Sequence, residues 1–293
     1  MRTRTRPYLL VFLLAAIAVL PPAVAAPPEK ALLTVTFLDV HQGDSIVIRT
    51  PDNKTIVIDG GQGATEKSRF DAGAEVLIPF LEKAGVAMID MVVSTHPDFD
   101  HLGGLVPLLR SRFPVGAVLD SGVPHTSQAY ENFMALIKEK KIPLIVPKKG
   151  ELLDWGTAAR AQVLAPQVPP EKRRDRDLNN SSIVIRLDYG AVSFLFTGDS
   201  ESPEEDEILS SGARARATVL KVSHHGSRTA SSPAFYYAIN PEVAVISVGK
   251  RNKFDHPHWE TVKMLRESAA RILQTDQTGT ITIATDGKTY EIR

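Results

Sequence analysis

The stretch H-P-D-F-D-H at residues 96–101 follows an apolar run, M-I-D-M-V-V, at residues 88–93. The β-forming residues of the run predict a buried strand, and the polar stretch is then the loop in which this strand ends. Four of the six side chains in the stretch are imidazoles or carboxylates. A chain that leaves a strand can turn several side chains towards one point, whereas a regular strand or helix separates them. The stretch therefore predicts a metal-binding loop.

The types of side chain in this loop favour a catalytic metal site over a structural one. Imidazole and carboxylate together suit zinc, manganese or iron, and the chain contains no cysteine that would supply thiolate. For any one of these residues alone, a polar surface loop is the simpler interpretation. Their combination favours metal binding, with four predicted ligands: His96, Asp98, Asp100 and His101.

The residues after the loop, L-G-G-L-V-P-L-L-R at 102–110, predict a helix. Its opening glycines, Gly103 and Gly104, are expected to let the backbone come close to the metals because they carry no side chain.

Two later apolar runs also end in side chains that bind metals. The run at residues 192–196 leads to Asp199, which we predict to be a bridging ligand. The run at residues 218–222 leads to His224 and His225; we predict that His225 is a ligand, with His224 as the alternative. Reactive groups of sheet proteins lie on the loops at strand ends, so the three runs predict one shared site.

Apolar alternation and turn residues predict the remaining elements, which alternate between strands and helices. The expected strands are 33–38, 45–49, 55–58, 183–187, 192–196, 280–284 and 288–292, and the expected helices are 72–84 and one that begins at 203.

The ordered motifs resemble the metallo-β-lactamase fold and, within it, the soluble C-terminal domain of the ComEC-type DNA-internalisation competence proteins. The resemblance covers residues 33–292. No single short motif would carry it, but the ordered set does. The set comprises F-L-D-V-H-Q-G-D-S at 37–45, I-D-G-G at 58–61, the loop at 96–101, N-N-S-S-I-V at 179–184, T-G-D at 197–199 and S-H-H-G-S at 223–227.

The chain departs from the superfamily pattern at three positions. Asp98 stands where the usual H-x-H-x-D-H loop has its second histidine, and Asn179 stands in a stretch that usually supplies another. Fewer imidazoles and more oxygen ligands shift the preference from zinc towards manganese. His41 replaces the glycine expected in D-V-G-Q-G-D, and we expect it to be tolerated there.

The resemblance implies an α/β (α+β) fold, a four-layer αββα sandwich with the site at one edge. We predict two divalent metal ions, zinc or manganese, with Asp100 and His101 towards the second ion and with Asp100 and Asp199 as catalytic residues. The predicted ligands are His96, Asp98, Asp100, His101, Asp199 and His225. Residues predicted to orient ligands or to face the substrate are Asp39, Asp59, Asn179, Ser182, His224 and His256.

Hydrolysis is the expected chemistry, since two close divalent ions lower the pKa of a shared water and stabilise a leaving group. The resemblance implies a phosphodiester substrate, most simply DNA. Hydrolysis of a lactone or lactam is one alternative, because the fold supports many hydrolases. A DNA-binding or metal-binding module without turnover is another. The oligomeric state stays open.

The first 25 residues predict a secretory signal peptide, which leaves a hydrolase domain at 26–293. Three arginines precede an apolar stretch at residues 8–20, and Ala23 and Ala25 fit the small-residue rule for cleavage. The apolar stretch is shorter than the roughly 20 residues that a membrane span needs. We therefore expect a secreted or periplasmic protein with no later membrane span; an uncleaved signal that anchors it to the membrane is the alternative.

Charge excludes a broad nucleic-acid coat. The whole chain has 34 basic and 34 acidic side chains, and residues 26–293 have 31 and 34, a net charge of −3. Phosphate contacts dominate the affinity of proteins that coat nucleic acid, and such proteins need a positive surface. Basic clusters at 172–176 and 250–253 are local; we expect them mainly to be solvated, and guidance of a phosphate towards the metals is the alternative.

Overall fold

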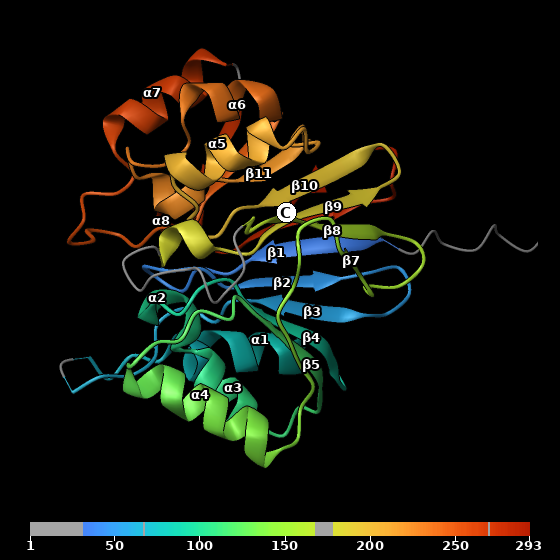
Figure 1. Cartoon of the computed structure of the whole chain (residues 1–293), viewed down its shortest axis with the longest axis vertical. Coiled ribbons are helices and arrows are strands. Elements are labelled where there is room, and N and C mark those ends of the chain that lie inside the picture. Colours follow the sequence, from blue (N-terminus) through green and yellow to red (C-terminus); the bar gives the residue numbers. More distant parts are fainter. Residues whose placement is uncertain (1–31, 67, 168–177, 269) are drawn as a thin grey trace, which may run out of the picture. The chain divides into compact units, whose positions relative to one another are not determined.

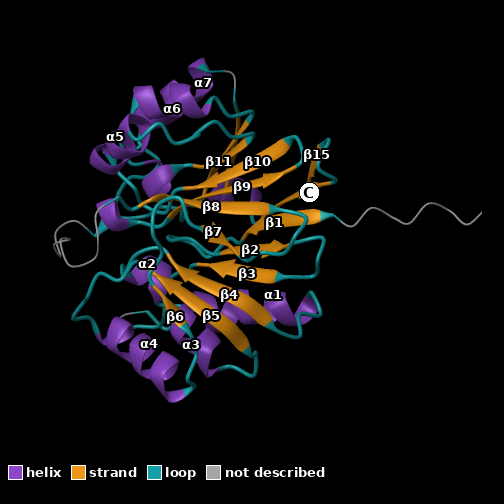
Figure 2. Ribbon diagram, turned by 45° about the vertical axis from the view of Figure 1, so that its right-hand side comes forward, coloured by secondary structure: helices purple, strands orange, loops and turns teal. Residues whose placement is uncertain are grey.

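The protein is described by a computed structural model that covers residues 32–293 except 67, 168–177 and 269. The predicted signal peptide and the basic cluster at 172–176 therefore lie outside the described residues. In the described part, two sheets pack face to face and helices cover the outer face of each (Figures 1 and 2). This arrangement is the four-layer αββα sandwich that the sequence predicts.

The first sheet is mixed. Neighbouring strands pair antiparallel from β15 to β3, whereas the strands from β3 to β6 run parallel. In the described residues its order is β15 (Tyr290–Ile292), β14 (Ile281–Thr285), β1 (Leu33–Phe37), β2 (Ile46–Arg49), β3 (Thr55–Ile58), β4 (Ile89–Ser94), β5 (Val115–Asp120) and β6 (Leu144–Ile145).

The second sheet is also mixed, with a parallel half from β10 to β13. Its described order is β13 (Arg271–Gln274), β12 (Val243–Ile246), β11 (Val219–Lys221), β10 (Val192–Phe196), β9 (Val184–Tyr189), β8 (Arg160–Ala165) and β7 (Leu152–Leu153).

The helices form the two outer layers, and short helical turns hold the loops between the sheets (Figure 1). Over the first sheet lie η1 (Gly73–Leu77), α1 (Ile78–Lys83), α3 (Leu105–Arg110) and α4 (Gln128–Glu139). Over the second sheet lie α5 (Ser202–Ser210), α6 (Pro233–Ile239) and α7 (Trp259–Glu267). The short turns are α2 (Phe99–Leu102), η4 (Asn179–Ser181), η5 (Ser223–Gly226) and α8 (Thr275–Thr278).

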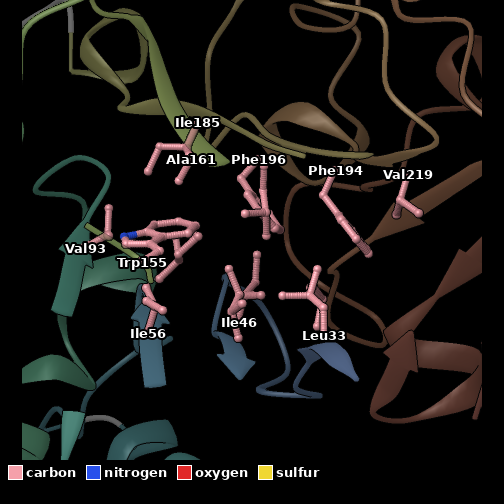
Figure 3. Close-up of a cluster of buried hydrophobic side chains, with 14 of the residues drawn as sticks. Leu33, Ile46, Ile56, Val93, Trp155, Ala161, Ile185, Phe194, Phe196 and Val219 are labelled. Carbon is pink, nitrogen blue, oxygen red and sulfur yellow. The ribbon is translucent and has the colours of Figure 1, made fainter. Parts of the chain in front are cut away.

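The main core lies between the inner faces of the two sheets, as Figure 3 shows. Ile56 and Val93 of the first sheet face Ala161 and Ile185 of the second, with the fully buried Trp155 among them. Burial on this scale is the main force that stabilises a domain, at roughly 25 cal/mol per Å² of apolar surface. Strands covered on both faces show continuous apolar runs, and this explains why the strands were recognisable in the sequence.

Parallel pairing brings the predicted ligand loops to one edge. β3 lies beside β4, and β10 lies beside β11, each pair in parallel register. The carboxyl ends of parallel strands meet at the same edge of a sheet, so Asp59 and His96 follow neighbouring strands, as do Asp199 and His224. The two sheets are also joined here, because the backbone N–H of Ile183 donates to the carbonyl of Thr95 over 3.0 Å.

The helix predicted at 102–110 differs from the observed structure. The chain turns into α2 at Phe99, breaks at the two glycines and resumes as α3. A Cβ on Gly103 would overlap the backbone N–H of Gly63, and one on Gly104 would overlap the carbonyl of Gly60. The two glycines thus let α2 and α3 pack against the loop that follows β3, and the expectation that they bring the backbone close to the metals stays a prediction.

Within the described residues, none of the helices has both the length and the apolar character that a bilayer crossing requires.

Candidate metal centre

Four histidines and several carboxylates converge at the edge where the ligand loops meet. His96 follows β4, and one turn of α2 carries Asp100 and His101 towards it. The ring centroids of His96 and His101 lie 4.2 Å apart, and those of His101 and His225 lie 5.2 Å apart. These three imidazoles are buried. His96 and Asp98 thus lie in the loop after β4, and one helical turn adds Asp100 and His101.

One group of possible ligand atoms consists of Asp100, His101 and His225, whose ligand atoms lie within 4.8 Å of one another. His101 Nδ1 lies 2.9 Å from the Asp59 carboxylate, and His225 Nδ1 lies 2.8 Å from the carbonyl of Ser247. Each Nδ1 therefore carries the hydrogen that it donates, and a neutral ring keeps its lone pair on Nε2.

These two Nε2 atoms lie only 3.3 Å apart, and that of His225 is 3.5 Å from Asp100 Oδ2. Two lone pairs and a carboxylate so close together repel one another unless a proton or a metal ion lies between them. The geometry therefore fits a divalent cation, and the partners of the Nδ1 atoms are those that orient histidine ligands in metal sites.

A second group consists of His96, His101 and Asp199, whose ligand atoms also lie within 4.8 Å. The Thr95 hydroxyl donates to Asp59 over 2.7 Å, so it accepts from Nδ1 of His96 at 3.1 Å. His96 Nε2 is buried and has no hydrogen-bond partner in the described part of the chain. Since buried polar atoms are normally satisfied, this nitrogen is available to a metal ion.

Asp199 joins the two groups. One of its oxygens lies 3.2 Å from His101 Nε2, and the other lies 3.4 Å from His225 Nε2 and 4.0 Å from His96 Nε2. Its backbone N–H donates to the Ser182 hydroxyl over 3.1 Å, which holds the residue at the end of β10. The same oxygen therefore faces His225 of the first group and His96 of the second, so Asp199 lies between the two groups, where a bridging ligand would lie.

Charges at the centre shift several pKa values strongly. Burial alone would lower the pKa of His101 and His225, but Asp199 and the other carboxylates outweigh it and hold both pKa values well above the usual range. Burial alone would raise the pKa of Asp199 and Asp100, yet the imidazoles lower both well below the usual range. The centre thus stabilises positive charge between its carboxylates, as a cation site does.

His224 approaches Asp199 from the more exposed side. Its Nε2 lies 3.7 Å from the oxygen that also faces His96, and its Nδ1 lies 2.9 Å from Glu201. His224 and His225 both have left-handed backbones, with φ of 46° and 52°. This conformation costs non-glycine residues about 1–2 kcal/mol each, and such strain clusters at functional sites. It turns the two consecutive imidazoles to the same carboxylate.

A buried ion pair supports the centre from behind. Lys221 Nζ lies 2.7 Å from Asp44, and both side chains are at most 2% exposed. Asp44 also lies 3.5 Å from His225 Nδ1, and its backbone N–H donates to the carbonyl of Asp100. Burial would raise the pKa of Asp44, but the Lys221 charge and His225 lower it. Asp44 therefore remains ionised and holds both predicted ligands in place.

The structure brings some predicted residues to the edge of the centre. The Asp98 carboxylate lies 3.6 Å from His96 Nε2 and is 38% exposed, so it lies on the solvent side. Asn179 donates to Glu201 over 3.4 Å and does not face a predicted ligand among its described contacts. His256 packs 5.4 Å from the His224 ring; burial, followed by the charges of His224 and His225, lowers its pKa to about 4.

Asp39 is not brought to a predicted ligand. Its carboxylate accepts from the backbone N–H of His41, and its own N–H donates to Thr280. Those described contacts stabilise the turn after β1, so the interpretation of Asp39 as a residue that orients ligands is not supported. Asp59 has that arrangement instead, because it accepts from His101 and twice from Thr95.

Sequence reasoning missed three residues that contact the predicted ligands or the alternative ligand His224, namely Asp44, Thr95 and Glu201, and also Lys221, which pairs with Asp44. Two signals were available. Asp44 lies inside the motif at 37–45, and Lys221 is a charged residue within an otherwise apolar strand. Thr95 and Glu201 left no signal in the sequence. The hydrogen bond between Thr95 and His96 depends on the ring tautomer, and Glu201 contacts His224, which is distant in the sequence.

Comparison with known proteins identifies the family of the chain. The family model of the metallo-β-lactamase superfamily matches residues 38–250, and the chain therefore belongs to this superfamily. The ComEC-type resemblance is also confirmed by curated relatives. ComE operon protein 3 of Bacillus subtilis is 32% identical over 256 residues, and competence protein ComA of Neisseria gonorrhoeae is 29% identical over 277 residues.

These two alignments cover 84% and 94% of this chain but 32% and 35% of the relatives. The chain thus spans about a third of the length of the curated relatives that it matches. Among solved structures, a putative metal-dependent hydrolase from Parabacteroides distasonis aligns over 83% of this chain and 93% of its own, with 15% identity and a TM-score of 0.49.

Proposed function

We propose that the protein is an exported phosphodiesterase that uses two divalent metal ions, zinc or manganese, and acts on DNA. The observation that carries the proposal is the position of Asp199 between two groups of imidazole and carboxylate side chains. Such paired sites suit displacement at phosphorus, where an attacking and a leaving oxygen both need charge stabilisation. The support for DNA as the substrate is the resemblance of the sequence motifs to the DNA-internalisation competence proteins, with relatives named for competence.

In this proposal the second ion is held by Asp100, His101 and His225, and Asp199 bridges to the first. The first ion is held by His96 and Asp98, with His224 in place of the histidine that the superfamily usually has near Asn179. The support for His224 is that its Nε2 and that of His96 face the same oxygen of Asp199, at 3.7 and 4.0 Å.

When bound, the two ions supply an activated water and stabilise the leaving oxygen. The protein's own side chains and backbone orient the histidine ligands. Asp59 and the Ser247 carbonyl keep the hydrogens of His101 and His225 on Nδ1, and Asp44 neutralises Lys221 behind them. Substrate enters from the side where Asp98 and Asp100 are 38% and 29% exposed, since the imidazoles on the other side are buried.

Export belongs to the proposal because of the basic, apolar and small-residue segments at residues 1–25. N-terminal sequencing of protein recovered from outside the cytoplasm tests it. A mature chain that begins after Ala25 is expected, and an intact Met1 would refute cleavage.

The activity is tested by stripping the protein of metal and restoring Mn²⁺ or Zn²⁺. Substrates are bis(p-nitrophenyl) phosphate, single-stranded DNA and double-stranded DNA, with the Asp100→Ala and Asp199→Ala variants as controls. Cleavage that requires both metal and these carboxylates is expected. If the protein cleaves only a lactone or a lactam, the proposed phosphodiester substrate is wrong and that class of ester or amide takes its place. Bound metal without turnover of any substrate would identify a binding module.

A further inference from the structure

A cavity of about 440 Å³ adjoins the proposed metal centre. Asp100 lines this cavity and also belongs to the group of possible ligands that it forms with His101 and His225, so a molecule in the cavity lies next to the reacting centre. The volume falls within the roughly 300–1,000 Å³ of sites that bind small organic groups. The other walls come from Gln42 and Gln62, from Phe99 and from the loop at 252–254.

Two of the walls are exposed aromatic rings. Phe99 is 36% exposed and Phe254 is 44% exposed, although large aromatic side chains usually bury most of their surface. Phe254 stacks on His256 with a centroid distance of 5.6 Å, which holds the ring in place. Phe99 makes no ring–ring contact within the described residues. Its face is therefore available to a planar group that enters the cavity.

Two of the polar side chains that line the cavity, Gln42 and Lys253, carry donors, whereas the Asp100 carboxylate is an acceptor that faces the metal centre. Gln42 uses its carbonyl oxygen to accept from the backbone N–H of Gly249, while its Nε2 is buried and has no hydrogen-bond partner among the described residues. The Lys253 ammonium lies 4.8 Å from the centroid of Phe254 and is exposed, so it can turn towards a phosphate. Asn252 is already used, because its amide holds Gly249 and His256 through backbone hydrogen bonds.

We propose that this cavity binds the nucleobase of the nucleotide next to the phosphodiester at the metal centre, which makes single-stranded DNA the preferred substrate. This inference rests on the proposed function. The base stacks on Phe99 beside Phe254, and Lys253 faces the adjoining phosphate. A base inside a duplex is covered on both faces and paired at its edge, so it has to leave the stack before it can enter.

The kinetic test compares two phosphodiesters that share one leaving group: the p-nitrophenyl ester of thymidine 5′-monophosphate and methyl p-nitrophenyl phosphate. In metal-loaded Phe99→Ala and Phe254→Ala, the ratio of kcat/KM for the thymidine ester to that for the methyl ester should fall by about 5- to 150-fold, the range for loss of a stacking side chain. Phe254→Tyr should restore the ratio. Trp259→Ala is the matched control, because Trp259 is 69% exposed but does not line this cavity.

A binding test that needs no turnover separates this inference from the proposed function. Fluorescence anisotropy of a labelled single-stranded oligonucleotide, with an abasic oligonucleotide for comparison, is measured on the metal-free protein and on the same variants. If Phe99→Ala and Phe254→Ala bind the oligonucleotide with bases more weakly but bind the abasic oligonucleotide as wild type does, the result supports the base-binding cavity. This holds even if the wild-type protein hydrolyses neither ester. Failure of the wild type to hydrolyse both esters would refute only the proposed phosphodiesterase activity. If these variants bind both oligonucleotides as wild type does and keep the wild-type ratio of kcat/KM, the proposal that the cavity binds a nucleobase is overturned. The proposed phosphodiesterase activity would not be affected by that result.

Discussion

Lys221 Nζ lies 2.7 Å from the carboxylate of Asp44, and this buried ion pair connects β11 of the second sheet to the loop before β2 of the first. The two residues are far apart in the sequence and meet only because the sheets pack face to face. A buried pair contributes little net stability, since desolvation offsets the attraction, but removal of one partner leaves an uncompensated charge.

Lys221→Met should therefore destabilise the metal-free protein by about 3–5 kcal/mol, because Asp44 is left ionised and buried. The double variant Asp44→Asn/Lys221→Met should recover a large part of that loss. Urea unfolding followed by circular dichroism measures both. A double variant no more stable than Lys221→Met would contradict the ion-pair account.

Asp59→Asn should weaken metal binding by about 10- to 100-fold, the usual effect of removing a group that orients a histidine ligand. The amide has one acceptor oxygen where the carboxylate has two, so it cannot accept from His101 and from both donors of Thr95. Competition with a chromophoric chelator measures the affinity. Asp39→Asn is the matched control and should bind metal as wild type does; an equal loss in both variants would refute the distinction between them.

Metal binding should release protons and should weaken as the pH falls. The carboxylates hold the pKa of His101 and His225 well above the usual range of histidine. Both rings are therefore imidazolium ions, with a proton on each nitrogen, in the metal-free protein at neutral pH. A metal ion takes the lone pairs only after these protons leave, and lower pH favours the protonated rings. Calorimetric titration near pH 7 in two buffers of different ionisation enthalpy should detect release of about one to two protons. Identical heats in the two buffers would be the contrary result.

Glu201→Gln tests His224 as a ligand of the first ion. Glu201 lies 2.9 Å from His224 Nδ1 and fixes the hydrogen there, so its loss should lower the affinity of the weaker of two metal sites by about 10- to 100-fold. The tighter site, with His225, should change little. Stoichiometric titration with Zn²⁺ resolves the two steps. Unchanged affinity in both steps would place His224 outside the first site.

Gly43→Ala and His41→Gly form a pair of backbone tests in the loop before Asp44. Gly43 has φ of 124°, and a Cβ there would overlap the carbonyl of Asp100, so alanine should cost about 1–3 kcal/mol and weaken metal binding. His41 has φ of 63°, where glycine is favoured, so His41→Gly should change stability by no more than about 1 kcal/mol. Thermal unfolding with and without metal measures both variants. A harmless Gly43→Ala would show that the loop can move away from Asp100.

Most of the fold was predictable because its strands are local patterns. The expected strands at 33–38, 55–58 and 192–196 match β1, β3 and β10 to within a residue. The expected helix at 72–84 is present as η1 followed by α1. The break between α2 and α3 was not predictable, because it depends on the close approach of Gly103 and Gly104 to a loop some 40 residues earlier.

The sequence by itself determined the class of fold and the types of side chain at the centre, since apolar runs specify buried strands and the motifs place histidines and aspartates where those strands end. Only the tertiary structure decided which of these side chains meet. It placed Asp59 against His101 and left Asp39 in the turn after β1. It also turned both His224 and His225 towards Asp199 and paired Asp44 with Lys221. These relationships depend on ring tautomers, left-handed backbone and contacts across two sheets, which are set by packing between segments distant in the sequence.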